Sequence, residues 1–264
     1  MNQHRARKRF GQHFLQDEHV VARIVDAIQP QANDHIVEIG PGLGVLTTAL
    51  LVHVSAMDAV ELDRDIIPKL ADRCGPLGIL NIHAADALQF DFAALATDAR
   101  PLRIVGNLPY NISTPLMFHL LESRSLIQDM HFMLQKEVVD RLAAQPGGKD
   151  YGRLSVMMQL HCQVESLFDV LPEAFSPPPR VDSAVVRLVP HTTPPVTVTD
   201  INLLDKLVTQ AFSQRRKTLR NTLRDYFSAD QMQTLGIDPG RRAETLSLHE
   251  FAALANACIN TKDC

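Results

Sequence analysis

The hydrophobic pattern of the first 136 residues alternates between two periods. Apolar residues spaced three or four apart predict helices over residues 18–29, 43–52, 65–73 and 114–122. Short apolar runs between them predict strands at residues 35–40, 56–63, 79–86, 102–108 and 130–136. Short apolar strands that alternate with helices form a parallel sheet covered on both faces. The pattern therefore predicts an α/β fold for this part of the chain.

The pattern changes after residue 150. Residues 151–163 have helical spacing, and residues 181–189 predict one late strand. Residues 190–200 are rich in Pro and Thr, which is typical of a linker. Only helical patterns follow, over residues 201–212, 215–227 and 248–259. We therefore expect two domains, an α/β domain over 1–190 and a small all-helical domain over 200–264.

Charge is distributed unevenly over the 264 residues, although the net charge is only −4. Residues 1–16 contain four basic residues and no carboxylate. A second basic run includes Arg216, Arg220 and Arg224, which recur every four residues and would share one helix face. Such segregation can create a positive surface for nucleic acid on an acidic protein. The alternative is a solvated helix face and a basic tail.

Several classes of protein are excluded or disfavoured by what the sequence lacks. No apolar run reaches the ~18 residues of a membrane span, and the basic N-terminus is not followed by the apolar stretch of a secretory signal. The four cysteines form no CxxC motif, and the 11 histidines form no HExxH motif. We therefore expect a cytoplasmic protein with reduced thiols, no metal site and no membrane association.

A glycine loop follows the first predicted strand of the sheet. Gly40, Gly42 and Gly44 lie between this strand and a helix, where glycines let a ligand approach the backbone closely. The third glycine is misplaced for a dinucleotide fingerprint, and the GK[ST] of a P-loop is missing. Glu61 lies 21 residues beyond Gly40, where an acid can bind ribose hydroxyls, and Asp86 ends the third strand. The loop predicts an adenosine-containing cofactor; alone, it could be a tight turn.

A second motif, Asn107-Leu108-Pro109-Tyr110, follows the fourth strand. The exocyclic amine of adenine is a weak nucleophile, because its lone pair is delocalised into the ring. Two acceptors, the Asn107 side-chain carbonyl and the Leu108 backbone carbonyl, can localise this pair and align it. Pro109 fixes the turn, and Tyr110 can stack on an extruded base. The alternative is an ordinary Asn-x-Pro turn with a buried tyrosine.

Longer blocks of the sequence resemble known enzymes. Glu38, two residues before Gly40, completes a loop that resembles the S-adenosylmethionine site of class I methyltransferases. NLPYNISTPL resembles the ribosomal RNA adenine N(6),N(6)-dimethyltransferases, as do RKRFGQHFL, LQKEVVDRL, YGRLSV, FSPPPRVDSAVVRL and FSQRRKTLRN. The resemblance covers nearly the whole chain. It implies a Rossmann-like methyltransferase sheet and dimethylation of two adjacent adenosines near the 3′ end of small-subunit rRNA.

The resemblance also implies roles for individual residues. Glu38 would support the loop or the methionine amine of the cofactor, and Phe175 would stack on the second face of the target base or pack in the core. The family usually has Asn at the position of His13, so the contact there differs in shape. The expected cofactor contacts are His13, Leu15, Glu38, Gly40, Gly42, Glu61, Asp86 and Asn107.

Alternative functions remain open. One alternative is a different methyltransferase, either a DNA adenine enzyme or a resistance-type enzyme acting on large-subunit rRNA, and the latter shares NLPY-like motifs. A ribosome-assembly or nucleic-acid-binding factor could use the same fold without catalysis. The blocks quoted above favour the small-subunit enzyme, with S-adenosylmethionine as cofactor and an immature ribosomal particle as partner. We expect a monomer, because the sequence shows no coiled-coil pattern and no symmetric apolar stripe.

Overall fold

The computed structural model describes residues 13–260, and the chain divides there into two compact units. The first contains the described residues up to Val139 together with Glu165–Pro190. The second contains Asp140–Val164 and the described residues from His191 onward. Residues 140–164 thus cluster with the C-terminal helices, whereas the sequence pattern grouped them with the α/β domain. The basic residues near the N-terminus lie outside the described residues.

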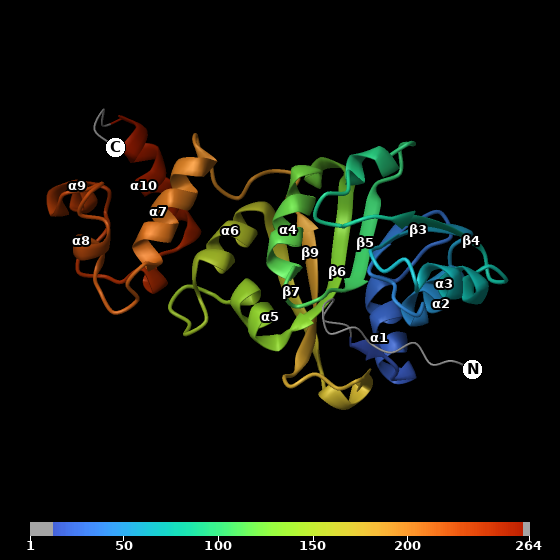
Figure 1. The fold of residues 1–264 in the computed structure, drawn as a ribbon. Coiled ribbons are helices and arrows are strands. Elements are labelled where there is room, and N and C mark those ends of the chain that lie inside the picture. Colours follow the sequence, from blue (N-terminus) through green and yellow to red (C-terminus); the bar gives the residue numbers. More distant parts are fainter. Residues whose placement is uncertain (1–12, 261–264) are drawn as a thin grey trace. The chain divides into compact units, whose positions relative to one another are not determined.

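A seven-stranded sheet forms the centre of the first unit (Figure 1). Its strands are β2 (His35–Ile39), β3 (Ala56–Glu61), β4 (Ile79–Ala84), β5 (Leu102–Asn107), β6 (Ile127–Gln135), β7 (Cys162–Val170) and β9 (Ser183–Pro190). Their spatial order is β4-β3-β2-β5-β6-β9-β7. The first five strands in this order are parallel, and β9 pairs antiparallel with β6. The sheet is therefore mixed, whereas the sequence pattern predicted a parallel sheet. The pattern could not reveal the antiparallel strand, because apolar periodicity carries no information on strand direction.

Both faces of the sheet are covered. All five residues of β2 and the first five of β5 are buried, and successive strand residues point to opposite faces. The helices of this unit are α1 (Glu18–Ile28), α2 (Val45–Leu51), α3 (Ile67–Cys74), α4 (Ser113–Glu122) and α5 (Lys136–Ala143), the last of which extends into the second unit. Helices α1, α2 and α3 lie together and bury an apolar cluster against one face (Figure 1). The predicted α/β architecture is confirmed.

Some elements were not predicted from the sequence. Helix α5 and strand β7 are additional, and a two-stranded antiparallel sheet pairs β1 (Phe14–Leu15) with β8 (Phe175–Ser176). Half-exposed β7 contains Glu165 and Asp169 and lacks the apolar run that identified the other strands. Two-residue strands carry no periodicity at all. The β1–β8 pairing matters for the site, because it brings the segment around residue 14 beside the segment around residue 176.

The second unit is built mainly from helices, which confirms the expected helical C-terminal region. They are α6 (Arg153–His161), α7 (Ile201–Phe212), α8 (Leu219–Thr222), α9 (Ala229–Thr234) and α10 (Leu248–Asn260). Helix α7 packs against α6 and α10. The ring of Phe212 contacts those of Tyr151 and Phe251, with centroids 6.2 Å and 5.8 Å away. This aromatic row belongs to the core of the unit.

The predicted single helix over residues 215–227 is wrong. Thr218 is extended, and only the four residues of α8 are helical. The backbone N–H groups of Leu219 and Arg220 donate to the carbonyls of Arg241 and Pro239, so tertiary hydrogen bonds replace those of a continuous helix. Leu219 and Leu223 are nevertheless buried, as their helical spacing beside the arginines would require.

Two further sequence expectations concern membranes and cysteines. Among residues 13–260, no helix has the length and apolar character needed to cross a membrane. Cys74 and Cys162 are buried and are not disulfide-bonded, which agrees with the expected reduced thiols. Cys258 is disulfide-bonded, so the expectation of reduced thiols is wrong at this position.

Candidate functional site

The glycine loop turns sharply between β2 and α2. Gly40, Gly42 and Gly44 have φ values of +66°, +56° and +80°, a region that favours glycine. A Cβ on Gly42 would lie 3.2 Å from the Phe14 ring, and one on Gly44 would lie 2.7 Å from Leu70 Cδ1. The loop therefore needs glycine for its conformation and for its close packing against neighbouring side chains.

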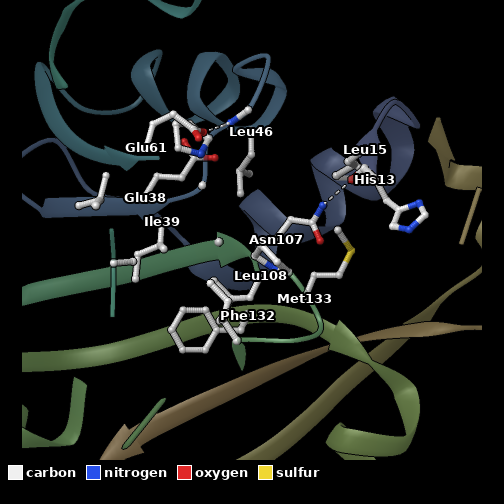
Figure 2. Close-up of a pocket in the computed structure, with 18 of the residues that line it drawn as sticks. His13, Leu15, Glu38, Ile39, Leu46, Glu61, Asn107, Leu108, Phe132 and Met133 are labelled. Atoms are coloured by element: carbon white, nitrogen blue, oxygen red, sulfur yellow. Dashed lines mark hydrogen bonds between the residues drawn. The ribbon is translucent and has the colours of Figure 1, made fainter. Parts of the chain in front are cut away.

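Two buried carboxylates support this loop. Glu61, at the end of β3, accepts hydrogen bonds from the N–H groups of Gly42 (3.1 Å) and Asp63 (2.8 Å). Glu38, in β2, accepts a 2.6 Å hydrogen bond from the Thr47 hydroxyl. Burial raises the pKa of both side chains, and that of Glu38 reaches about 7. Figure 2 shows the two carboxylates side by side at one end of the pocket.

A cavity of about 360 Å³ opens beside the loop, at the carboxyl ends of the parallel strands. This volume lies at the lower end of the range of small-molecule sites, about 300–1,000 Å³. Asp86 lines it from the loop after β4, where its carboxylate accepts a 3.0 Å hydrogen bond from the N–H of Leu88. Phe132 and Met133 line it from β6. In open α/β sheets, ligands bind at this edge.

The NLPY segment borders the same cavity. Asn107 ends β5, and its Nδ2 donates a 3.0 Å hydrogen bond to the His13 carbonyl (Figure 2). Leu108 is buried, and its N–H donates to the Met133 carbonyl at 3.2 Å. The Ile112 N–H donates to the Pro109 carbonyl at 3.1 Å, which closes the predicted turn. The segment is therefore fixed at three points around the cavity.

Tyr110 extends from this turn and is half-buried. Its hydroxyl forms a 2.9 Å hydrogen bond with the Ser183 hydroxyl. Its ring lies nearly parallel to that of His13, with centroids 6.0 Å apart and an interplanar angle of 23°. The His13 ring points away from Asn107 (Figure 2). Its Nδ1 donates a 2.7 Å hydrogen bond to the Pro177 carbonyl.

One cavity thus collects most of the residues singled out in the sequence. They are His13, Leu15, Glu38, Gly40, Gly42, Glu61, Asp86, Asn107, Leu108, Pro109 and Tyr110. They come from the ends of four parallel strands and from β1. Within residues 13–260, no group of three or more His, Cys, Asp or Glu side chains is arranged to hold a metal ion. The donor set suits an uncharged or cationic organic ligand with hydroxyl and amine groups.

Comparison with known proteins identifies the family. The sequence model described as "Ribosomal RNA adenine dimethylase" matches residues 3–260. The chain belongs to this family. It is 57% identical over 251 residues to "Ribosomal RNA small subunit methyltransferase A" of Nitrosococcus oceani, covering 95% of each chain. It is 56% identical over 254 residues to the protein of the same name from Pseudomonas aeruginosa, covering 96% of this chain and 95% of the relative.

Solved structures agree with this assignment. A dimethyladenosine transferase from Plasmodium falciparum superimposes with a TM-score of 0.81 at 27% identity, covering 94% of this chain and 98% of its own. The 23S rRNA methyltransferase ErmE shares the fold, with a TM-score of 0.73 at 23% identity, covering 93% of this chain and 99% of its own.

Other residues that the resemblance or the charge pattern singled out lie outside the cavity. Phe175 of this family member is 4% exposed and packs in the core beside Leu15, so the structure favours its reading as a packed side chain. A stacking role for Phe175 stays a prediction. Arg216, Arg220 and Arg224 are exposed in the second unit. They do not share one helix face as predicted, because the helix is interrupted before α8.

Sequence reasoning missed several side chains of the site. Phe132 and Met133 lie within the predicted strand of residues 130–136, a few residues before its carboxyl end, so the rule that ligands bind at strand ends could have pointed to their neighbourhood. Leu62 is 50% exposed and lines the cavity directly after Glu61. Thr47, the partner of Glu38, lies one helical turn after the glycine loop, and only its contact reveals its role.

Proposed function

We propose that the chain dimethylates the exocyclic amines of two adjacent adenosines near the 3′ end of small-subunit rRNA, with S-adenosylmethionine as methyl donor. The observation that carries this proposal is the orientation of the Asn107 amide. A backbone carbonyl only accepts, so the hydrogen bond to the His13 carbonyl requires Nδ2 at that end. The other end, Oδ1, is then the acceptor available to a target amine at the cavity.

The donor set of the cavity fits the cofactor. An ionised carboxylate has about four acceptor sites, so Glu61 can bind ribose hydroxyls while it holds two backbone N–H groups. Asp86 lines the cavity and would accept from the adenine amine, and Leu15 supplies an apolar wall. Gly40 and Gly42 let the ligand approach the backbone, and Glu38, which accepts from Thr47, would support the loop or the methionine amine. When bound, the cofactor supplies an electrophilic methyl group on a sulfonium.

The NLPY residues then prepare the nucleophile. Asn107 Oδ1 and the Leu108 carbonyl accept the two hydrogens of the adenine amine and localise its lone pair toward the methyl group. The nitrogen–carbon bond forms as the carbon–sulfur bond breaks, and the ammonium product loses a proton to solvent. Pro109 fixes the turn that holds both acceptors. Tyr110 stacks on the base once it is extruded, as base-modifying enzymes require.

RNA contacts extend beyond this cavity. Arg216, Arg220 and Arg224 bind phosphates from the helical domain of residues 200–264, since exposed arginines supply the sequence-independent part of such binding. The substrate is rRNA within an immature small-subunit particle, and the chain acts as a cytoplasmic monomer. Mutation of these arginines is therefore expected to affect RNA affinity rather than the chemical step.

One assay tests the function directly. Isotope-labelled S-adenosylmethionine is incubated with the chain and either immature small subunits or naked RNA, and digested RNA is analysed by mass spectrometry. Formation of N6,N6-dimethyladenosine at two adjacent positions supports the proposal, with Asn107→Ala as the inactive control. Particle binding without transfer would identify a non-catalytic assembly factor. Primer extension across both rRNAs of a deletion strain would reveal a large-subunit target instead.

A further inference from the structure

Ser183 is a buried polar residue whose side chain has no assigned role in the proposed reaction. It is the first residue of β9, and it is completely buried. Strand β9 pairs antiparallel with β6, where Ser183 lies opposite Gln135, so its backbone position is fixed by the sheet. A buried hydroxyl is costly unless it has a hydrogen-bond partner. The partner of Ser183 is the hydroxyl of Tyr110, 2.9 Å away.

Among residues 13–260, the Ser183 hydroxyl is the hydrogen-bond partner of the Tyr110 hydroxyl. The Tyr110 ring projects from the turn after β5, and the Ser183 bond joins the tip of the ring to β9 on the far side of β6. Burial raises the pKa of the phenol, so the hydroxyl keeps its proton at neutral pH and either hydroxyl of the pair can donate. The His13 ring lies along one face of Tyr110 and is itself tied to the Pro177 carbonyl.

We propose that Ser183 is a positioning residue, which holds the Tyr110 ring in the orientation that stacks on the target adenine. Stacking requires a defined ring plane, and a hydrogen bond at the tip of the ring restricts its swing about the side-chain torsions. Without this bond, only a fraction of the molecules present a competent ring. Apparent affinity for the base falls by that fraction, whereas the transfer step itself is unchanged. The inference rests on the stacking role of Tyr110 in the proposed function.

The test is a double-mutant cycle between Ser183→Ala and Tyr110→Phe. Each variant removes the same hydrogen bond, and Tyr110→Phe retains the ring. A bond of about 0.5–1.5 kcal/mol corresponds to an increase of about two- to tenfold in KM for the RNA, with kcat nearly unchanged. The double variant should be no worse than either single variant. Ser183→Thr, which restores a hydroxyl, should recover most of the loss.

A matched control separates positioning from stability. Ser155 is also completely buried, and its hydroxyl donates to the Arg141 carbonyl in the second unit. The Ser155 hydroxyl also accepts from the Gly152 N–H, so Ser155→Ala should lower thermal stability at least as much as Ser183→Ala and leave the KM for RNA unchanged. Affinity for S-adenosylmethionine, measured by calorimetry, should be the same in all variants. Additive effects of Ser183→Ala and Tyr110→Phe would overturn the proposal, as would an unchanged KM in Tyr110→Phe.

Failure of the inference and failure of the proposed function give different results. Wild-type chain that transfers no methyl group to small-subunit rRNA contradicts the function. The quenching of 2-aminopurine, placed at the target position of an RNA oligonucleotide, reports stacking independently of turnover. Weaker quenching with Ser183→Ala and Tyr110→Phe, and no further loss in the double variant, supports the positioning role. Equal quenching by wild type and Tyr110→Phe refutes it.

Discussion

Glu38 should make the stability of the cofactor-free protein depend on pH in an unusual direction. Its side chain is 2% exposed and shares the pocket with Glu61. Burial is the main cause that raises its pKa from 4.5 to about 7; the Thr47 hydrogen bond opposes the rise, and the charge of Glu61 adds to it. At neutral pH a large fraction of Glu38 is therefore protonated in the folded chain.

The sign of the effect follows from proton binding. The folded-state pKa lies above the unfolded value, so the native state binds more protons between pH 4.5 and about 7. The stability that Glu38 contributes by binding this proton is fully present below pH 4.5 and is lost as the pH rises through about 7. At 1.36 kcal/mol per pH unit, the interval corresponds to a loss of up to about 3 kcal/mol in the free energy of unfolding.

Glu38→Gln tests this prediction, because glutamine cannot ionise but still offers Thr47 an acceptor oxygen. Urea unfolding at pH values from about 5 to 8 gives the free energy of unfolding of both proteins. The curves should converge near pH 5, and the variant should be more stable than wild type at pH 8. The difference curve isolates Glu38, since Glu61 also has a raised pKa and titrates in both proteins.

The matched control for this series is Glu165→Gln, at an exposed carboxylate on β7. It should shift the unfolding curve by a similar small amount at every pH. The free energies of unfolding of wild type and Glu38→Gln could instead differ by a constant amount from about pH 5 to 8. The Glu38 carboxylate would then be ionised in the folded protein over this whole range. The reasoning from burial would then be wrong.

Three further predictions concern the proposed reaction. Asn107→Ala should lose most methyl transfer while calorimetry still detects S-adenosylmethionine binding; near-normal turnover would exclude the acceptor role. Glu61→Ala should weaken cofactor binding by about 1–3 kcal/mol, the scale of a charge-assisted hydrogen bond, and an unchanged dissociation constant would mark Glu61 as purely structural. Neutralising Arg216, Arg220 and Arg224 together should reduce the log–log salt slope of particle binding by roughly 0.7–0.9 per lost phosphate contact, with cofactor affinity retained. A constant slope would place these arginines away from the RNA.

The part of the site that follows strand ends could be predicted from sequence. Each of β2, β3 and β5 is a buried apolar run, so its carboxyl end is visible in the sequence, and parallel strands bring these ends to one edge. Gly40, Glu61 and Asn107 occupy or directly follow such ends, and they line one cavity. Hydrophobic periodicity and the rule that ligands bind at the carboxyl ends of parallel strands were therefore sufficient to predict these three residues.

Other features depended on tertiary contacts that no local pattern encodes. The helical spacing of residues 215–227 was real, since Leu219 and Leu223 are buried, but hydrogen bonds to the carbonyls of Arg241 and Pro239 break the helix. The resemblance alone suggested that Phe175 stacks on the target base or packs in the core. No local pattern reveals its pairing opposite Leu15 in the β1–β8 sheet, where the side chain is buried.

Ser183 shows why one class of site residue escapes the strand-end rule altogether. The rule looks for residues at the carboxyl ends of strands, because it assumes that all strands run in one direction. Strand β9 runs antiparallel to β6, so its amino end, Ser183, lies opposite Gln135 at the carboxyl end of β6. The first residue of an antiparallel strand thus reaches the same edge as the last residues of the parallel strands. A polar residue there can serve the site, which is why Ser183 meets Tyr110 although 73 residues separate them in sequence.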